Sequence, residues 1–210
     1  MNNKSCRLST AYFAPVQYFS KIAQVQKIIL EQHEHYLKQT YRNRCNIYAA
    51  HGVMALTIPV VKNHGAKMPI RDVRIDYATN WQHLHWRAIV SYYNASPFFE
   101  YYADDFHPYY EQKEIFLFDW NEKILRKILE LAGIHATIEY TEEFSAHYPD
   151  NDYRYIITPK THPADINFKP QNYYQVFASL HGFMANLSIL DLLCNEGPNS
   201  LNVLQACFVE

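Results

Sequence analysis

The sequence predicts an α/β fold: a Rossmann-like layered sheet, mixed but mainly parallel, with an inserted β-hairpin and a helical C-terminal half. Three patterns carry this prediction. A strand, a proline-containing loop, a helix and a second strand follow one another between residues 7 and 31. Two apolar runs then flank a glycine turn, and helical periodicity dominates after residue 80. An α+β fold is the alternative. For a chain of 210 residues we expect a single domain over residues 1–210.

The N-terminal unit has the pattern of two parallel strands joined by a helix. Residues 7–13 indicate a first strand that ends at Ala14-Pro15, because proline cannot donate to a strand ladder. Residues 16–23 carry aromatic and aliphatic side chains at one-face helical spacing, and the apolar centre of residues 27–31 indicates a buried strand. This order is typical of a compact βαβ unit, whose two strands pair in parallel.

A β-hairpin is predicted next. The apolar runs 45–50 and 53–61 flank His51-Gly52, and glycine adopts the positive φ angles that tight hairpin turns require. Residues 73–76 indicate a further short strand.

Helices dominate the rest of the predicted structure. Residues 80–112 show helical spacing, and Pro97 suits the first position of a second helix within that stretch. Asp119 to Glu122 resembles a capping box, which would open an amphipathic helix that ends at Gly133. A strand, a long polar connection and a C-terminal helix are expected at residues 137–140, 145–170 and 187–195.

Composition limits the classes of protein to which the chain can belong. A net charge of −2 argues against a general nucleic-acid binder, which usually shows a strongly basic face. The N-terminus has no apolar signal-peptide core, and no run of about 18 apolar residues occurs, so we expect a cytoplasmic protein without a membrane span. The four cysteines form no C-x-x-C pair, which indicates reduced thiols and no structural zinc site. No motif identifies a cofactor.

The strongest candidate for a binding site is the segment 36–44, where cations lie between aromatic rings. Lys38, Arg42 and Arg44 offer a point charge and two bidentate forks for phosphate or carboxylate, and Tyr36 offers a stacking face. Between a parallel strand and a hairpin, the segment would lie near a strand's carboxyl end, where ligands of open α/β sheets gather. We therefore expect a small anionic ligand; a solvated basic loop is the alternative.

Acidic and imidazole side chains supply candidates for proton transfer. His33 and Glu34, directly after the second strand, are candidates for a general base, and ordinary surface polar residues are the alternative. Asp191 lies in an apolar run and needs a partner if it is buried, so it is either catalytic or paired with Arg42 or Arg44. Ser188 is a candidate substrate contact whose default role is to cap the following helix.

Three segments, in this order and spacing, resemble the WbqC-like protein family. They are Ala11-Tyr12-Phe13-Ala14-Pro15-Val16-Gln17-Tyr18-Phe19; Tyr36-Leu37-Lys38 with Asn43-Arg44 and Leu56-Thr57-Ile58-Pro59-Val60; and Leu187-Ser188-Ile189-Leu190-Asp191-Leu192-Leu193.

The resemblance implies a role in making surface polysaccharides such as O-antigen, because members occur in gene clusters of that kind. Transfer of glycine or another acyl group to an amino sugar has been suggested for the family. We therefore expect a transferase that uses a sugar nucleotide or an activated acyl donor. Lys38, Arg42 and Arg44 would hold phosphates, while Tyr12 and Asn43 would position the substrate. The alternatives are a non-catalytic carbohydrate- or nucleotide-binding protein, and a scaffold subunit with its aromatic side chains in a homodimer interface.

Overall fold

A computed structural model describes residues 4–62, 67–148, 151–160 and 165–209. Three parallel strands form its main sheet in the order β1-β2-β5: β1 (Ser5–Ser9), β2 (Lys27–Glu31) and β5 (Thr137–Tyr140). Helix α1 (Val16–Ile22) joins β1 to β2, which confirms the predicted βαβ unit. Cys6, Leu8, Ile28 and Leu30 alternate along the two strands and are buried, which is why these residues form a half-buried sheet.

The predicted hairpin is also confirmed. Strands β3 (Arg44–Ala49) and β4 (Gly52–Thr57) pair in antiparallel fashion, and Gly52 adopts a φ of 104° in the turn. Residues 73–76 do not form a strand of their own. Isolated bridges join Val60 to Ile75 and Arg74 to Phe116 instead.

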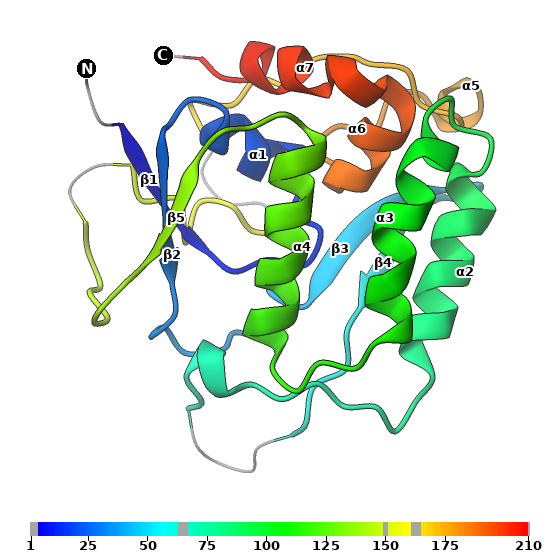
Figure 1. Cartoon of the computed structure of the whole chain (residues 1–210). Helices are drawn as coiled ribbons and strands as arrows, with labels where there is room; N and C mark the ends of the chain where they lie inside the picture. The colour runs from blue at the N-terminus through cyan, green and yellow to red at the C-terminus, as the bar shows by residue number, and fades with distance from the viewer. Residues whose placement is uncertain (1–3, 63–66, 149–150, 161–164, 210) are drawn as a thin grey trace.

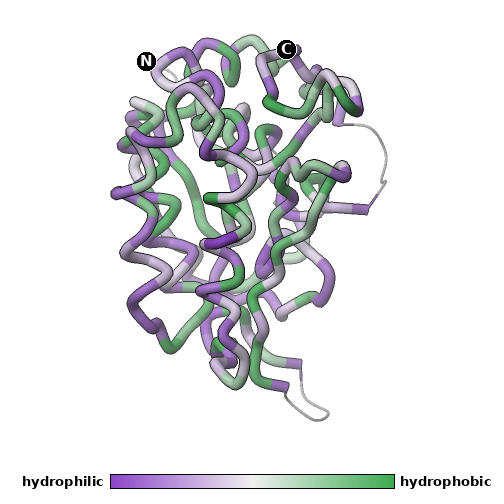
Figure 2. The backbone as a smooth tube through the Cα atoms, turned by 90° about the vertical axis from the view of Figure 1, so that its right-hand side faces the viewer, coloured by the Kyte–Doolittle hydropathy of each residue, from purple (hydrophilic) through white to green (hydrophobic). Residues whose placement is uncertain are grey.

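Helices pack around the sheet and the hairpin. They are η1 (Ile70–Asp72), α2 (Trp81–Tyr93), α3 (Phe99–Glu111), α4 (Leu117–Leu131), α5 (Ala178–His181), α6 (Ile189–Glu196), η2 (Gly197–Asn199) and α7 (Ser200–Ala206). Figure 1 shows the parallel sheet on one side of the molecule, α2 and α3 on the other, α4 between them, and α6 and α7 across the top. Along the helices, hydrophilic and hydrophobic residues alternate, as expected for elements with one buried face (Figure 2). This arrangement confirms the α/β fold with a helical C-terminal half.

Several boundaries differ from those predicted, and three of them matter most. The first strand ends at Ser9, and Phe13 has a φ of 38°, so residues 10–13 leave the sheet in a turn. Helix α3 begins at Phe99, after Pro97. The capping box at Asp119 is wrong, because α4 already begins at Leu117 and its N-cap residue makes no side-chain cap hydrogen bond.

Many of the aromatic side chains are buried in the core or pack against it. Tyr12, Tyr93 and Trp120 are at most 1% exposed. Tyr12 hydrogen bonds through its hydroxyl to His85 Nδ1 at 2.9 Å and to the Tyr110 hydroxyl at 2.8 Å. Burial lowers the pKa of His85 to about 4, so this imidazole is neutral at physiological pH. Within the described ranges, no helix combines the length and apolar character needed to cross a lipid bilayer.

Candidate functional site

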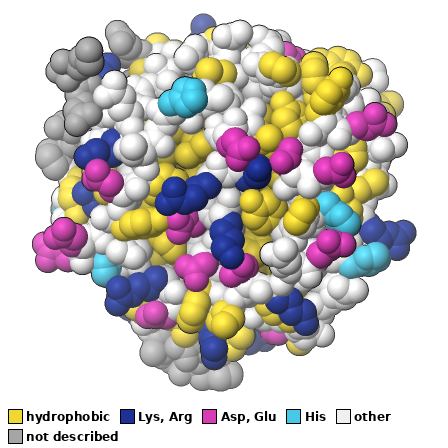
Figure 3. Space-filling view, in the orientation of Figure 1, with side chains coloured by type: hydrophobic (Ala, Val, Ile, Leu, Met, Phe, Trp, Pro, Cys, Tyr) yellow, Lys and Arg dark blue, Asp and Glu magenta, His cyan; other side chains and the backbone are white. Residues whose placement is uncertain are grey.

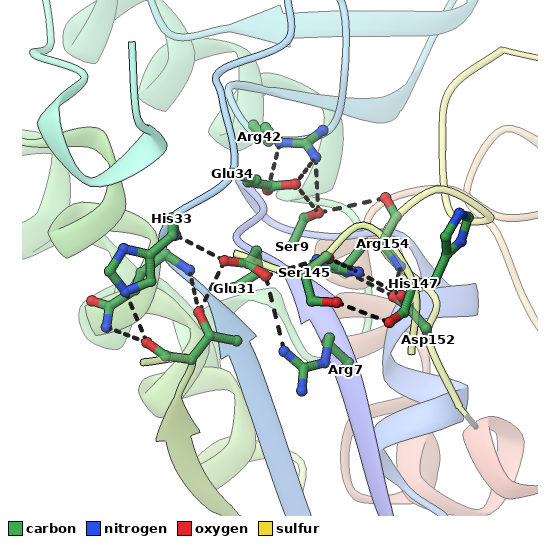
Figure 4. Close-up of polar contacts among 12 residues, drawn as sticks. Arg7, Ser9, Glu31, His33, Glu34, Arg42, Ser145, His147, Asp152 and Arg154 are labelled. Atoms are coloured by element: carbon green, nitrogen blue, oxygen red, sulfur yellow. Dashed lines mark hydrogen bonds and ion pairs between the residues drawn. The ribbon is translucent and has the colours of Figure 1, made fainter. Parts of the chain in front are cut away.

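Polar side chains gather where the parallel strands β1 and β2 end. Ser9 and Glu31 are the last residues of these strands and lie opposite each other in the register. The chain that follows β2 returns with Glu34 and Arg42, and a distant segment brings Asp152 and Arg154 (Figure 4). The carboxyl ends of parallel strands are the usual place for ligand sites in open α/β sheets.

Arg42, Glu34 and Ser9 form the first unit of this cluster. Arg42 donates from Nε to Glu34 Oε1 at 2.8 Å and from Nη2 to Glu34 Oε2 at 2.5 Å, and both side chains are almost fully buried. Arg42 Nη2 also donates to Ser9 Oγ at 2.9 Å, and Ser9 Oγ donates to Glu34 Oε2 at 3.1 Å. Nη1 of Arg42 makes none of the hydrogen bonds found among the described residues, so one edge of the guanidinium keeps free donors.

Arg154 is the centre of the second unit. Its side chain has no solvent exposure and donates to Glu31 Oε2 at 2.7 Å, to both carboxylate oxygens of Asp152 at 2.8 and 2.6 Å, and to the Ser145 carbonyl at 2.9 Å. Burial disfavours the charged form of Arg154, but the hydrogen bonds and charges of Asp152 and Glu31 outweigh it and raise its pKa. A parallel bridge between Arg7 and Asp152 attaches this segment to the free edge of β1.

His33 lies on the opposite side of Glu31 from Arg154 (Figure 4). Its backbone N–H donates to Glu31 Oε1 at 2.8 Å, and its Nε2 lies 3.0 Å from the Thr141 carbonyl oxygen. Because a carbonyl oxygen only accepts, Nε2 of the neutral ring carries the proton and Nδ1 carries the lone pair. The half-buried imidazole is thus held in one tautomer and orientation, with Nδ1 as its basic nitrogen.

Two hollows adjoin the cluster, and the same two segments line both. The smaller, of about 10 Å³, lies among Ser9, Thr10, Arg42 and Arg154 and has room for about one water molecule. The larger is a groove of about 540 Å³. One wall consists of Leu37, Lys38, Gln39 and Thr40, and the other of Tyr155, Ile156, Thr158 and Lys160.

The segment 36–44 therefore divides between the protein's surface and its interior. Lys38 is exposed in the groove, Arg42 is buried in the cluster, and Asn43 is buried with Nδ2 donating to the Ile58 carbonyl at 2.8 Å. Arg44 begins β3 and is half-buried, and its Nε finds no hydrogen-bond partner among the described residues. Tyr36 is half-buried, and desolvation raises the pKa of its hydroxyl.

Other predicted site residues lie elsewhere. Tyr12 belongs to the core and lines neither hollow. Ser188 caps α6, accepting from Leu190 N at 3.3 Å and donating to the Phe13 carbonyl at 2.8 Å, which confirms its default role. The suggested partnership of Asp191 with an arginine is wrong. Asp191 Oδ2 accepts from Tyr173 Oη at 2.7 Å and Gln175 Nε2 at 2.8 Å, whereas Arg42 is committed to Glu34.

Several residues of the cluster were not among the predicted site residues. Glu31 carries a usable signal, since it is the polar last residue of the predicted strand 27–31. Ser9 lies inside the predicted first strand, and only the structure shows that this strand ends there. Arg154, Asp152 and Lys160 carry none, because they lie in a stretch without periodicity that was expected to be a polar connection. They reach the site only because this distant segment bridges to β1 through Asp152 and Arg7.

Comparison with known proteins gives a family. The profile of the WbqC-like protein family matches residues 10–162, which include α1, β2 and the cluster residues from Glu31 to Arg154 and begin one residue after Ser9, the end of β1. The uncharacterised protein Rv1507c of Mycobacterium tuberculosis is 33% identical over 122 residues, which are 58% of this chain and 52% of that protein. The chain thus spans about half the length of this relative. No solved structure matches. The extent of the profile match establishes that the chain belongs to the WbqC-like protein family.

Proposed function

We propose that the protein is a transferase that takes a group from an anionic activated donor, a sugar nucleotide or an acyl donor, during the synthesis of surface polysaccharide. The observation that carries this proposal is the groove of about 540 Å³ whose two lining segments, each with a lysine, lead directly to Arg42 and Arg154 of the strand-end cluster. Its size is that of a typical small-molecule site, and its position is the one that α/β sheets commonly use for such ligands. Membership of the WbqC-like protein family supports the polysaccharide context that the resemblance implies.

In this proposal, each side chain of the groove and the cluster has a different role. Lys38 and Lys160 attract the donor's negative charge, and the free Nη1 edge of Arg42 receives an anionic oxygen that reaches the smaller hollow. Glu34 keeps the guanidinium of Arg42 in place through two hydrogen bonds and also orients the Ser9 hydroxyl. Because these contacts occupy both of its oxygens, Glu34 acts as a positioning residue.

His33 is the proton acceptor in this proposal, although it lines neither hollow and adjoins the cluster at Glu31. Transfer requires an acceptor hydroxyl or amine to attack the donor, a base to take the acceptor's proton, and the leaving group to depart with the bonding electrons. The Thr141 carbonyl fixes the His33 tautomer so that Nδ1 presents a lone pair. A base held in one orientation contributes about 10²- to 10⁴-fold to such a reaction.

The test is turnover of a panel of sugar nucleotides and acyl-CoA thioesters with amino-sugar acceptors, followed by release of nucleoside diphosphate or of free thiol. His33→Gln keeps an N–H that can donate to the Thr141 carbonyl but removes the base, so we expect a loss of about 10²-fold or more in kcat with the donor's Kd unchanged. His135→Gln, which changes an exposed histidine beyond α4, is the matched control and should turn over as the wild type does.

Non-catalytic binding is the second candidate, and one observation favours it. The carboxylates of Glu31, Glu34 and Asp152 are all paired with guanidinium groups, so none of the three is a free base. If the wild-type protein binds a donor but no donor in the panel turns over with any acceptor, binding is the function and the transferase proposal is wrong. If His33→Gln turns over at the wild-type rate, His33 is not the base.

A further inference from the structure

We propose that the groove binds the nucleoside diphosphate part of its ligand, with a planar ring against Tyr155 and Leu37 and the two phosphates between Lys38 and Lys160. This inference rests on the proposed function and makes it more specific, because sugar nucleotides and acyl-CoA thioesters share a nucleoside diphosphate. The groove would then recognise the part that the two donor classes have in common.

Two lysines give the groove its positive charge. Lys38 and Lys160 are exposed, line the same groove from two different segments of the chain, and have no carboxylate within ion-pair distance among the residues that the structure describes. The cations of helix α4 behave differently. Lys123, Arg126 and Lys127 each pair with an acidic side chain, and Figure 3 shows Lys and Arg interspersed with Asp and Glu on that face.

Two lysines that line one groove, with no acidic partner among the described residues, give it a local positive field in a chain that is nearly neutral overall. A lysine ammonium is a compact point charge suited to phosphate oxygens. Two of them in one groove match two linked phosphates better than a single one.

The same groove also exposes apolar side chains. Leu37 and Tyr155 are each 46% exposed and Ile156 is 41% exposed, which places three large apolar side chains in contact with solvent at one site. Scattered apolar residues on a surface need no explanation, but a group of them lining a hollow is typical of a ligand site. A plain inorganic anion would leave these side chains in water, whereas a nucleobase would cover them.

Each segment that lines the groove has a contact within the protein that restrains it. The ring centroid of Tyr155 lies 5.3 Å from the guanidinium carbon of Arg154, whose side chain is itself fully buried. On the other wall, Thr40 Oγ1 donates to the Leu37 carbonyl at 2.7 Å, and Gln39 has a φ of 59°. Such restraints reduce the conformational entropy that binding must overcome.

The position of the groove also indicates where the rest of the donor lies. Segments 37–42 and 153–158 line both the groove and the smaller hollow beside Ser9. With the diphosphate between the lysines, the transferred group extends along these segments towards Ser9 and Arg42. The nucleoside part supplies affinity, and the cluster at the strand ends meets the reacting bond.

The experiment is isothermal titration calorimetry of the full chain with UDP, ADP, uridine, adenosine and inorganic pyrophosphate. We expect each nucleoside diphosphate to bind at least 10-fold more tightly than its nucleoside and than pyrophosphate. Lys38→Met and Lys160→Met should each weaken diphosphate binding about 5- to 20-fold without changing the melting temperature. Tyr155→Ala should weaken nucleoside and diphosphate binding alike. Lys169→Met, which changes an exposed lysine outside the groove, is the matched control and should bind as the wild type does.

Each contrary outcome has a separate meaning. Pyrophosphate that binds as tightly as UDP and ADP overturns the ring part of the inference. Wild-type affinity in both Lys38→Met and Lys160→Met overturns the groove as the site, even if donors still turn over. Tight diphosphate binding that depends on both lysines, together with no turnover of any donor, supports this inference and contradicts the transferase.

Discussion

Two buried carboxylates, Glu31 at the end of β2 and Asp191 in α6, have opposite kinds of hydrogen-bond partner. Glu31 has no solvent exposure and accepts from the guanidinium of Arg154 at 2.7 Å. Asp191 is 1% exposed, and both of its side-chain donors, Tyr173 and Gln175, are neutral. Its second oxygen, Oδ1, has no hydrogen-bond partner among the described residues.

The difference shows how each half of the molecule stabilises a buried carboxylate. Desolvation raises the pKa of Asp191 to about 6, although hydrogen bonds from Tyr173 and Gln175 oppose the shift. The carboxylate in the helical half therefore takes up a proton near pH 6, far above the ordinary value of 3.8. The strand ends instead hold opposite charges in fixed pairs, as a site for a charged ligand requires. Substitutions and pH should therefore affect the two regions differently.

The largest effect is expected from Arg154→Met. It would leave Glu31 and Asp152 without their guanidinium partner, and removing one partner of a buried ion pair costs roughly 3–5 kcal/mol. Urea unfolding at pH 7 measures the loss. Arg126→Met, at an exposed pair with Glu122 on α4, is the control and should cost about 1 kcal/mol or less. Equal losses of unfolding free energy in the two variants would show that the buried Arg154 ion pairs stabilise the fold no more than an exposed pair does.

The comparison predicts a pH-dependent effect for Asp191→Asn. The folded pKa of about 6 lies above the ordinary value of 3.8, so the charged form destabilises the fold above about pH 6. That penalty, on the order of 3 kcal/mol, disappears as pH falls from about 6 towards 4. The free energy of unfolding of the wild type should therefore rise relative to Asp191→Asn over this range. Urea titrations at pH 7.5, 6, 5 and 4.5 measure the difference, and a constant gap would contradict a raised pKa.

The smallest effect is expected from Ser188→Ala, which removes a neutral cap in the helical half. Loss of an N-cap hydroxyl typically costs about 1 kcal/mol, and here the hydroxyl also donates to the Phe13 carbonyl. Thermal unfolding should show a drop of a few degrees that does not vary between pH 5 and 8. A pH-dependent loss would mean that the cap is coupled to Asp191, three residues along the helix.

The sequence predicts the local elements of this protein better than its site. The βαβ unit, the hairpin at Gly52 and the helix before Gly133 are confirmed because their signals are local: alternation, a glycine turn and a 3.6-residue period. Glu34 and Arg42 are found in the cluster because they follow a strand end. Arg154 is missed because its partner Glu31 lies 123 residues away, and no local pattern encodes which distant segment returns to a sheet edge.

That separation has a consequence for how the protein folds. Residues of β1 and β2 emerge early during synthesis, but the segment with Asp152 and Arg154 follows 123 residues after Glu31. At about 5–20 residues per second, Glu31 spends roughly 6–25 seconds on the ribosome before its guanidinium partner has been made. Contacts of such long range also slow folding, because a large loop must close before they form. The strand-end cluster is therefore expected to assemble among the last parts of the structure, so ligand binding reports on chains that have completed their fold.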